Sequence, residues 1–314
     1  MRFSGYEFGL RALVMVILVQ ACMGGRKLTA LVQQPPLVLS YHNGALLEGD
    51  LTISLVWYGK FSPSQRAIVT DFLQSLDPSI KGAAHTPSVS SWWATLHKYP
   101  PAATKAGAIK ATVHLGTQHI DRAYSMGHSL KRAHIAKLAA KAGVSAGVVV
   151  VLTAPDVTVD GFCMSSCGFH GSGVSPNGKG KYAYIWVGNS ETQCPGQCAW
   201  PFHQPMFGPQ TPPLVAPNGD VGVEGMVINV ASLLAGTVTN PFGNGYFQGT
   251  ASAPLEAASA CPGAYGNGAF PGYPGNLLVD KVTGVSYNAN GVNGRKYLLP
   301  ALWDPQTKSC STLV

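Results

Sequence analysis

The sequence predicts a single domain of the α/β or α+β class, in which helices pack on one mixed β-sheet. Three observations favour this class. Segments with the two-residue period of strands alternate with segments that have the 3.6-residue period of helices. Residues 147–153 form a continuous apolar run, which is typical of a strand covered on both faces. From Asn240 onward the chain is rich in Gly, Pro and Tyr, so we expect loops and short strands that wrap the core.

The elements are expected in the order β-α-α-β-α-β-β-α. The first strand alternates and is rich in β-formers, and the first helix has Pro63 in its first turn and Pro78 beyond its end. The second helix carries Trp92 and Trp93. Residues 163–180, between the last two strands, are expected to form a loop. The predicted strands are residues 51–58, 108–115, 147–153 and 182–188, and the predicted helices are residues 62–76, 90–99, 129–141 and 220–236.

Residues 1–24 are predicted to be a cleavable secretion signal. Arg2 and Arg11 give a basic start, residues 12–19 form an apolar run, and residues 21–25 are small apart from Met23. The apolar run is too short to cross a hydrocarbon core, which needs about 20 residues.

We place the cleavage after Gly24, and cleavage after Ala30 is the alternative. The mature chain is then one domain over residues 25–314. No later stretch reaches about 18 apolar residues, so we expect no membrane span in the mature protein. The protein is therefore predicted to be secreted into the extracellular space.

The cysteines also indicate export. Seven are present, and Cys22 leaves with the signal. An even number in an exported protein predicts three disulfides, with 15 pairings open. The alternative is a zinc site, because His170 and His203 follow cysteines at ligand-like spacings. An oxidising compartment favours disulfides, so we expect no metal and no cofactor. The six cysteines are Cys163, Cys167, Cys194, Cys198, Cys261 and Cys310.

Charged residues are only 11% of the chain, and the formal net charge is +7. The basic residues are spread out, apart from Lys131, Arg132 and Lys137 on one predicted helix, and we expect no nucleic-acid partner. A mildly basic extracellular protein can adhere to acidic polymers. The alternative is that the charge serves solubility alone.

Familiar catalytic motifs are absent from the sequence. It contains no Gly-x-Ser-x-Gly elbow and no His-Glu-x-x-His. A glycosidase needs two carboxylates that face each other across a cleft. We expect instead that Asp220 caps the helix that Glu224 begins, and a secreted glycosidase stays open as the alternative. We expect no catalytic residue and a protein that is not an enzyme. The closest carboxylate pairs are Asp156/Asp160, Asp220/Glu224 and Glu48/Asp50.

A rigid recognition loop is expected over residues 194–203, fixed by the cysteines at 194 and 198. Exposed aromatic side chains on a rigid loop are common in sugar and protein recognition. The alternative is that they fill the core under the loop. The candidate recognition residues are His170, Trp200, Phe202 and His203.

Six segments carry a family resemblance. They are residues 57–60, 161–171, 186–189, 193–203, 235–241 and 295–300. Together they resemble the plant Exordium, or phosphate-induced protein, family over nearly the whole mature chain. The resemblance implies a secreted protein of the apoplast and cell wall. It also implies a link to cell expansion and growth, downstream of brassinosteroid or carbon status, and supplies no catalytic residues.

Residues 231–241 are also similar to the zinc-site helix of some secreted bacterial peptidases, which runs Ser-His-Glu-x-x-Glu-x-x-Thr-Asp-Pro. In this chain Ser232, Leu233 and Gly236 stand where that helix has its metal ligands and catalytic base. This resemblance implies a degenerate peptidase-like fold that has lost its metal site.

The sequence therefore favours a non-enzymatic extracellular protein that regulates plant growth. Its partner is unknown, and the two expected classes are an acidic wall polysaccharide and a cell-surface protein. Two alternatives stay open: a secreted glycosidase or metallohydrolase, and a wall carbohydrate-binding protein.

Overall fold

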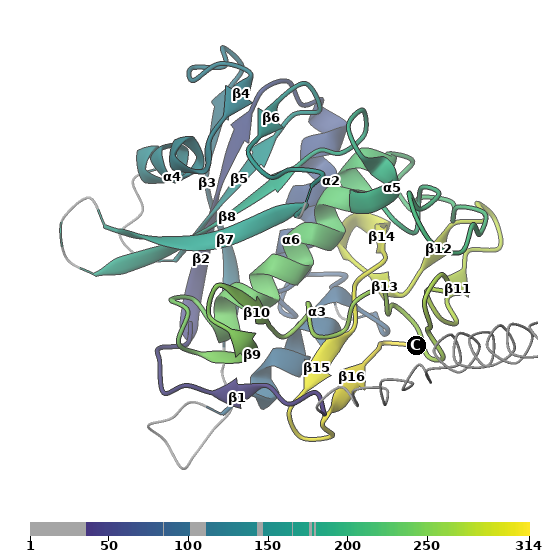
Figure 1. Ribbon diagram of the computed structural model, residues 1–314. Coiled ribbons are helices and arrows are strands. Elements are labelled where there is room, and N and C mark those ends of the chain that lie inside the picture. Colours follow the sequence, from purple (N-terminus) through teal and green to yellow (C-terminus); the bar gives the residue numbers. More distant parts are fainter. Residues whose placement is uncertain are drawn as a thin grey trace, which may run out of the picture. The chain divides into compact units, whose positions relative to one another are not determined.

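A five-stranded sheet forms the centre of the fold (Figure 1). Its strand order is β3-β2-β5-β8-β7, where β2 is Gly49–Tyr58, β3 is Ala111–Asp121, β5 is Val148–Thr153, β7 is Gly168–Val174 and β8 is Lys181–Gly188. Neighbours are parallel except for β7, which is antiparallel to β8. A mixed sheet with packed helices confirms the predicted α/β class.

The computed structural model describes residues 36–83, 85–100, 111–142, 147–164, 166–175, 178 and 180–314. The predicted secretion signal, Cys22, both cleavage positions and residues 108–110 of a predicted strand lie outside these ranges. Residues 37–314 form one compact unit.

The central strands are the most deeply buried. All six residues of β5 and the last six of β2 are buried, as the continuous apolar run of β5 predicts. Such strands need cover on both faces, and helices supply it.

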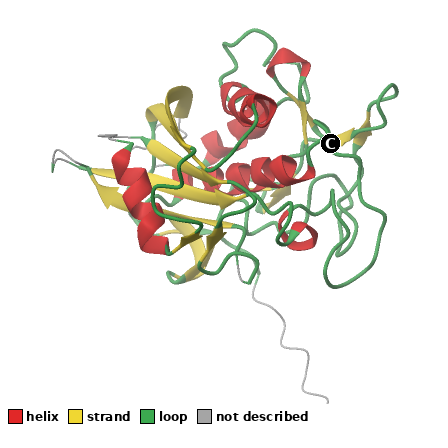
Figure 2. Ribbon diagram, turned by 90° about the horizontal axis from the view of Figure 1, so that it is seen from above, coloured by secondary structure: helices red, strands yellow, loops and turns green. Residues whose placement is uncertain are grey.

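Three long helices cover the sheet. Helices α2 (Pro63–Gln74) and α6 (Val221–Thr239) contact each other on one face, and α4 (Arg132–Lys141) lies on the other (Figures 1 and 2). The arrangement follows from the strand order. β3 and β5 lie on opposite sides of β2, and right-handed crossovers in opposite directions place their helices on opposite faces.

The second predicted helix is present as α3 (Val89–Trp93), which continues into the 3₁₀ helix η1 (Ala94–Lys98). Both tryptophans on it are buried. Trp92 Nε1 donates to the carbonyl of Pro300 at 2.7 Å, and Trp93 Nε1 donates to that of Ala111 at 2.8 Å. These bonds satisfy the two buried indole groups and join the helix to the sheet and to the end of the chain.

The expectation of a loop over residues 163–180 is wrong, because β7 occupies much of it. Glycine-rich sequence has low strand propensity, which hid this edge strand. The glycines serve packing. A Cβ on Gly171 would lie 2.8 Å from the ring of Tyr184, and one on Gly173 would lie 2.7 Å from the ring of Tyr182. Only glycine leaves room for these cross-strand rings.

Other bounds also differ from expectation. Strand β3 continues to Asp121, beyond the predicted end at Leu115. Ser129–Leu130 is not the start of α4 but a short strand, β4, paired in parallel with β6 (Thr158–Val159). Leu130 is buried in this bridge, so α4 begins only at Arg132.

The end of the chain forms loops and short strands, as expected. The 3₁₀ helix η2 (Val292–Gly294) lies in this part, and β1 (Ser40–Tyr41), near the start of the described chain, pairs with its first strand. The strands are β9 (Tyr246–Thr250), β10 (Ala253–Leu255), β11 (Leu278–Val279), β12 (Ser286–Tyr287), β13 (Ala289–Asn290), β14 (Lys296–Tyr297), β15 (Leu302–Asp304) and β16 (Ser309–Ser311). Buried hydroxyls fasten this part to the core. Tyr297 donates to the carbonyl of Ile68 at 2.9 Å, and Tyr99 donates to that of Trp303 at 2.6 Å.

The three expected disulfides are present. They join Cys163 to Cys194, Cys167 to Cys198, and Cys261 to Cys310. The first two link the segment before β7 to the short helix α5 (Pro195–Cys198), and the third ties the end of the chain. All six sulfurs are consumed, so the two cysteine–histidine groupings supply no thiolate for zinc.

Helix α6 begins at its Asp220 cap and ends three residues beyond the predicted end at Gly236. The hydroxyls of Thr237 and Thr239 donate to helix carbonyls four residues earlier, which lets polar residues extend a buried helix. Within the described residues, α6 alone is long and apolar enough to cross a membrane, but 78% of the apolar window is buried inside the protein. It is the core helix of the fold.

The disulfides predict unequal losses of stability. We expect the double variant Cys261→Ala/Cys310→Ala to lose about 2–4 kcal/mol, because its bridge alone closes the loop between positions separated by 49 residues. Cys163→Ala/Cys194→Ala should lose less, since Cys167–Cys198 still closes almost the same loop. Urea unfolding measures both, and equal losses would contradict the loop-closure account.

Candidate binding site

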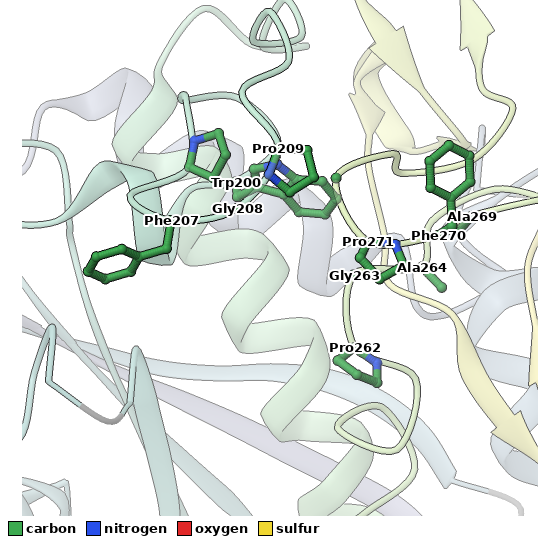
Figure 3. Close-up of a pocket in the computed structure, with 12 residues that line it drawn as sticks. Trp200, Phe207, Gly208, Pro209, Pro262, Gly263, Ala264, Ala269, Phe270 and Pro271 are labelled. Atoms are coloured by element: carbon green, nitrogen blue, oxygen red, sulfur yellow. The ribbon is translucent and has the colours of Figure 1, made fainter. Parts of the chain in front are cut away.

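A hollow of about 560 Å³ lies between two loops, residues 200–209 and 262–272 (Figure 3). This volume is in the range of ligand pockets. In Figure 3, Phe207 and Phe270 lie at opposite sides of the view with Trp200 between them. The lining residues are Trp200, Pro205, Phe207, Gly208, Pro209, Pro262, Gly263, Ala264, Ala269, Phe270, Pro271 and Gly272.

The first loop is anchored by buried side chains of the core. Phe202 is buried in a small cluster with Ala216, Ile228, Tyr265 and Leu298. Tyr265 holds Trp200 as well: their ring centroids are 5.7 Å apart, and the Tyr265 hydroxyl donates to the Trp200 carbonyl at 3.3 Å. The indole is therefore placed by packing that does not depend on a ligand.

The second loop is anchored at both ends. Cys261, bonded to Cys310, precedes it, and Phe270 and Tyr273 exchange two backbone hydrogen bonds at 2.8 and 3.0 Å. The loops meet at Gly272, where φ is +88° and a Cβ would lie 2.7 Å from the ring of Pro209. Glycine is required there by both the backbone and the close approach.

The rim of the hollow carries exposed aromatic side chains. Phe207 is 83% exposed and Phe270 is 64% exposed, although large apolar side chains normally avoid water. A second hollow of about 390 Å³ lies beside the first and shares Pro205 and Phe207 with it. Its other lining residues are Met164, Gly196, Gln197 and Met206. A grouped apolar surface of this kind is a candidate binding site.

The structure separates the four candidate recognition residues. Trp200 lines the hollow, while Phe202 is buried at 3% exposure and serves the core. His203 is exposed, with Nδ1 3.0 Å from the carbonyl of Gln204. His170 lies on β7, in a different part of the fold. Sequence reasoning missed Phe207 and Phe270. The sequence pattern that could have identified them is a phenylalanine followed by Gly and Pro, which occurs in each of the two loops.

His170 of β7 belongs to a buried polar cluster that lies against α6 at Gly236. Its Nε2 lies 3.0 Å from both carboxylate oxygens of Glu256, and Asn240 Nδ2 donates to Glu256 Oε1 at 2.7 Å. Gly236 faces this cluster, because a Cβ on it would lie 2.5 Å from Glu256 Oε2.

The same contacts involve the residues of α6 that were compared with a zinc-site helix. Glu256 fills the space into which a longer side chain at Gly236 would project, and Leu233 packs beside Gly168 of β7. The Ser232 hydroxyl donates to the carbonyl of Ile228. Among the described residues, no three His, Cys, Asp or Glu side chains are grouped closely enough to hold a metal ion.

Three members of the carboxylate pairs accept hydrogen bonds within the chain. Asp220 caps α6 by accepting from the backbone of Val223 at 2.9 Å, as its position suggested. Glu224 is buried, and Asn218 donates to it through its backbone and side chain at 2.8 and 2.6 Å. Asp156 accepts from the Tyr124 hydroxyl at 2.7 Å.

The remaining members of the pairs, Glu48, Asp50 and Asp160, are exposed. None of these carboxylates lines either hollow.

Comparison with known proteins identifies relatives along the whole chain. Residues 39–313 match the family model described as phosphate-induced protein 1 conserved region. The protein PHOSPHATE-INDUCED 1 of Nicotiana tabacum is 60% identical over 98% of this chain and 99% of its own. In Arabidopsis thaliana, EXORDIUM-like 1 is 62% identical over 87% and 89%, and EXORDIUM is 56% identical over 98% and 100%. No solved structure matches.

Glu224 predicts a dependence of stability on pH. Burial raises the pKa of its carboxyl from 4.5 to about 7. The folded state therefore holds the proton more tightly, so this contribution is complete below about pH 4.5 and is lost as the pH rises through 7. The shift corresponds to about 3 kcal/mol.

Glu224→Gln keeps the acceptor for Asn218 and cannot ionise. We expect it to raise the free energy of unfolding at pH 8 and to leave it nearly unchanged at pH 4.5, whereas the exposed control Glu191→Gln changes neither. Urea titrations at both pH values measure this. A Glu224→Gln variant with the pH profile of the unmodified protein would refute it.

Gly236→Ala should be destabilising by about 1–3 kcal/mol, although alanine normally favours a helix interior. The new methyl group would press on Glu256, which is held in place by His170 and Asn240. A double-mutant cycle with Glu256→Ala tests the cause. The cost of Gly236→Ala should shrink in that background, and an unchanged cost would exclude the contact as its origin.

Proposed function

Because the chain belongs to the phosphate-induced protein 1 family, with EXORDIUM and the EXORDIUM-like proteins among its relatives, we propose that it is a secreted protein of the plant cell wall. In this proposal it regulates growth and cell expansion by binding a partner, and it is not an enzyme. The link to brassinosteroid or carbon status is part of the proposal and rests on the family resemblance.

The observation that carries the proposal is the set of three disulfides. Disulfides persist in oxidising compartments outside the cytosol. Cys194, Cys198 and Cys261 are almost fully buried, so their bridges belong to the core of the fold and are not occasional surface oxidation. The predicted signal over residues 1–24 is consistent with this location.

Binding is supported by the candidate site itself. Its loops are held by disulfides and by buried aromatic contacts, and it presents apolar rings to solvent. The carboxylates that sequence reasoning considered for catalysis cap α6, are buried beside Asn218, or lie outside the hollows. This arrangement favours recognition over hydrolysis as the use of the site.

The location has a direct test. We expect the protein recovered from plant extracellular fluid to begin at Gly25, and its six cysteines to resist alkylation until a reductant is added. N-terminal sequencing and intact mass measure both. A protein found inside the cell with free thiols and an intact Met1 would contradict the proposal.

The role in growth is tested by complementation. In plants that lack the protein, we expect the unmodified chain to restore cell expansion, and Phe207→Ala/Phe270→Ala to be secreted normally but to fail. Both side chains are largely exposed, so the fold should not change. Val282→Ala is the matched control, because Val282 is 93% exposed outside the site. Full rescue by the double variant would exclude the hollow from this role.

A further inference from the structure

We propose that the two adjoining hollows form one groove that binds a proline-rich segment of another extracellular protein in the polyproline II conformation. The proposal rests on the secreted location proposed above, and it adds the chemical class of the partner. We call the lining residues of both hollows together the aromatic groove.

The shape of the groove suits an extended chain. The two hollows share Pro205 and Phe207, so they adjoin each other and one continuous chain can occupy both. A small ligand usually has most of its surface buried, whereas here the aromatic side chains of the rim are 83% and 64% exposed. A polyproline II helix has three residues per turn and a rise of about 3.1 Å per residue, so it returns a ring to the same face at each turn. Successive rings can then enter successive hollows.

The hydrogen-bonding groups of the groove favour a partner that accepts but does not donate. Trp200 Nε1–H donates to no group in the described part of the chain, although its ring lines the first hollow. Proline has a carbonyl and no N–H, so a proline-rich segment offers acceptors and few donors.

The groove offers few side-chain acceptors, and some of its carbonyl groups already accept hydrogen bonds within the chain. Six lining residues have carbonyls that accept hydrogen bonds from this chain; they are Trp200, Pro205, Gly208, Ala264, Phe270 and Gly272. In the first hollow no lining side chain carries an acceptor, and in the second only Gln197 has an amide and the two methionines have weakly accepting sulfurs. A sugar chain presents many hydroxyl donors, and in the first hollow it would find only backbone carbonyls as acceptors, six of which already accept hydrogen bonds within the chain. This argues against a glycan as the occupant.

Charge also restricts the partner. No lining residue of either hollow is charged, in a chain with a formal charge of +7. An acidic polysaccharide would find no cation in the groove. A neutral proline-rich segment needs none, and its rings pack against Trp, Phe and Pro as in other grooves lined by aromatic residues.

Neither the groove nor a proline-rich segment would lose much conformational freedom on binding. The groove has four prolines in its first hollow, at 205, 209, 262 and 271, and disulfides anchor its loops. A polyproline II segment is also stiff before it binds. Rigid partners lose less conformational freedom on association, so modest contact area can support measurable affinity.

Fluorescence anisotropy with a labelled decaproline peptide tests the proposal on the full mature protein with its disulfides intact. We expect saturable binding, and no binding of a glycine–serine peptide of equal length. Cellohexaose and a galacturonic acid oligomer serve as competitors that should not displace the peptide. Failure of decaproline to bind the folded protein, or displacement by either sugar, would overturn the assignment.

Three variants locate the binding. Phe207→Ala and Phe270→Ala should each weaken binding about tenfold. Trp200→Phe keeps an aromatic ring but removes the N–H, and should weaken binding several-fold. Val282→Ala, exposed outside the groove, should bind like the unmodified protein. Unchanged affinity in the two phenylalanine variants would refute the groove as the site.

The outcomes separate this inference from the proposed function. If decaproline fails to bind but Phe207→Ala/Phe270→Ala still fails to restore growth in plants, the ligand class is wrong and the role of the hollow stands. If the peptide binds but the double variant restores growth fully, the groove is a binding site that the growth role does not use.

Discussion

Close approach to helix α6 is the constraint on which the rest of the fold depends. This helix contacts β7, β8, α2 and α5, so the sheet, a covering helix and the disulfide-linked loop all meet on it. Glycines make the approach possible. A Cβ on Gly225 would lie 2.7 Å from the carbonyl of Cys198, and one on Gly236 would lie 2.5 Å from Glu256. The helix is apolar on nearly every side, and it is stable because every side is covered.

The candidate site is an extension of that packing. Helix α5 lies on α6 and is bonded through Cys198 to the segment before β7, so the loop that follows α5 starts from a fixed point. Phe202 then turns inward toward Ile228 of α6, which leaves Trp200 at the surface. The position of the Trp200 ring therefore follows from contacts made in the core.

The sequence was informative where one physical signal dominated. A continuous apolar run predicted β5, periodic apolar residues with an aspartate cap predicted α6, and an even cysteine count predicted three disulfides. It failed where glycine served tertiary packing, since β7 has glycines under tyrosine rings and resembles a loop. The other aromatic residues that line the hollow with Trp200 could not be inferred either. Phe207 and Phe270 are 63 residues apart in the chain, and only folding brings them to the same hollow. Disulfide pairing was open for the same reason.

The uncharged lining of the aromatic groove has a consequence for how complexes form. Charged surfaces steer their partners over distances set by the ionic strength, and this groove has no such long-range pull of its own. Encounters would be governed by diffusion and orientation, and affinity by how slowly the complex comes apart. Recognition of this kind is little affected by the screening of charges when the salt content of the surrounding fluid changes. In the proposed cell-wall location, which is rich in polyelectrolytes, the groove would hold a neutral partner with little dependence on the ions around it.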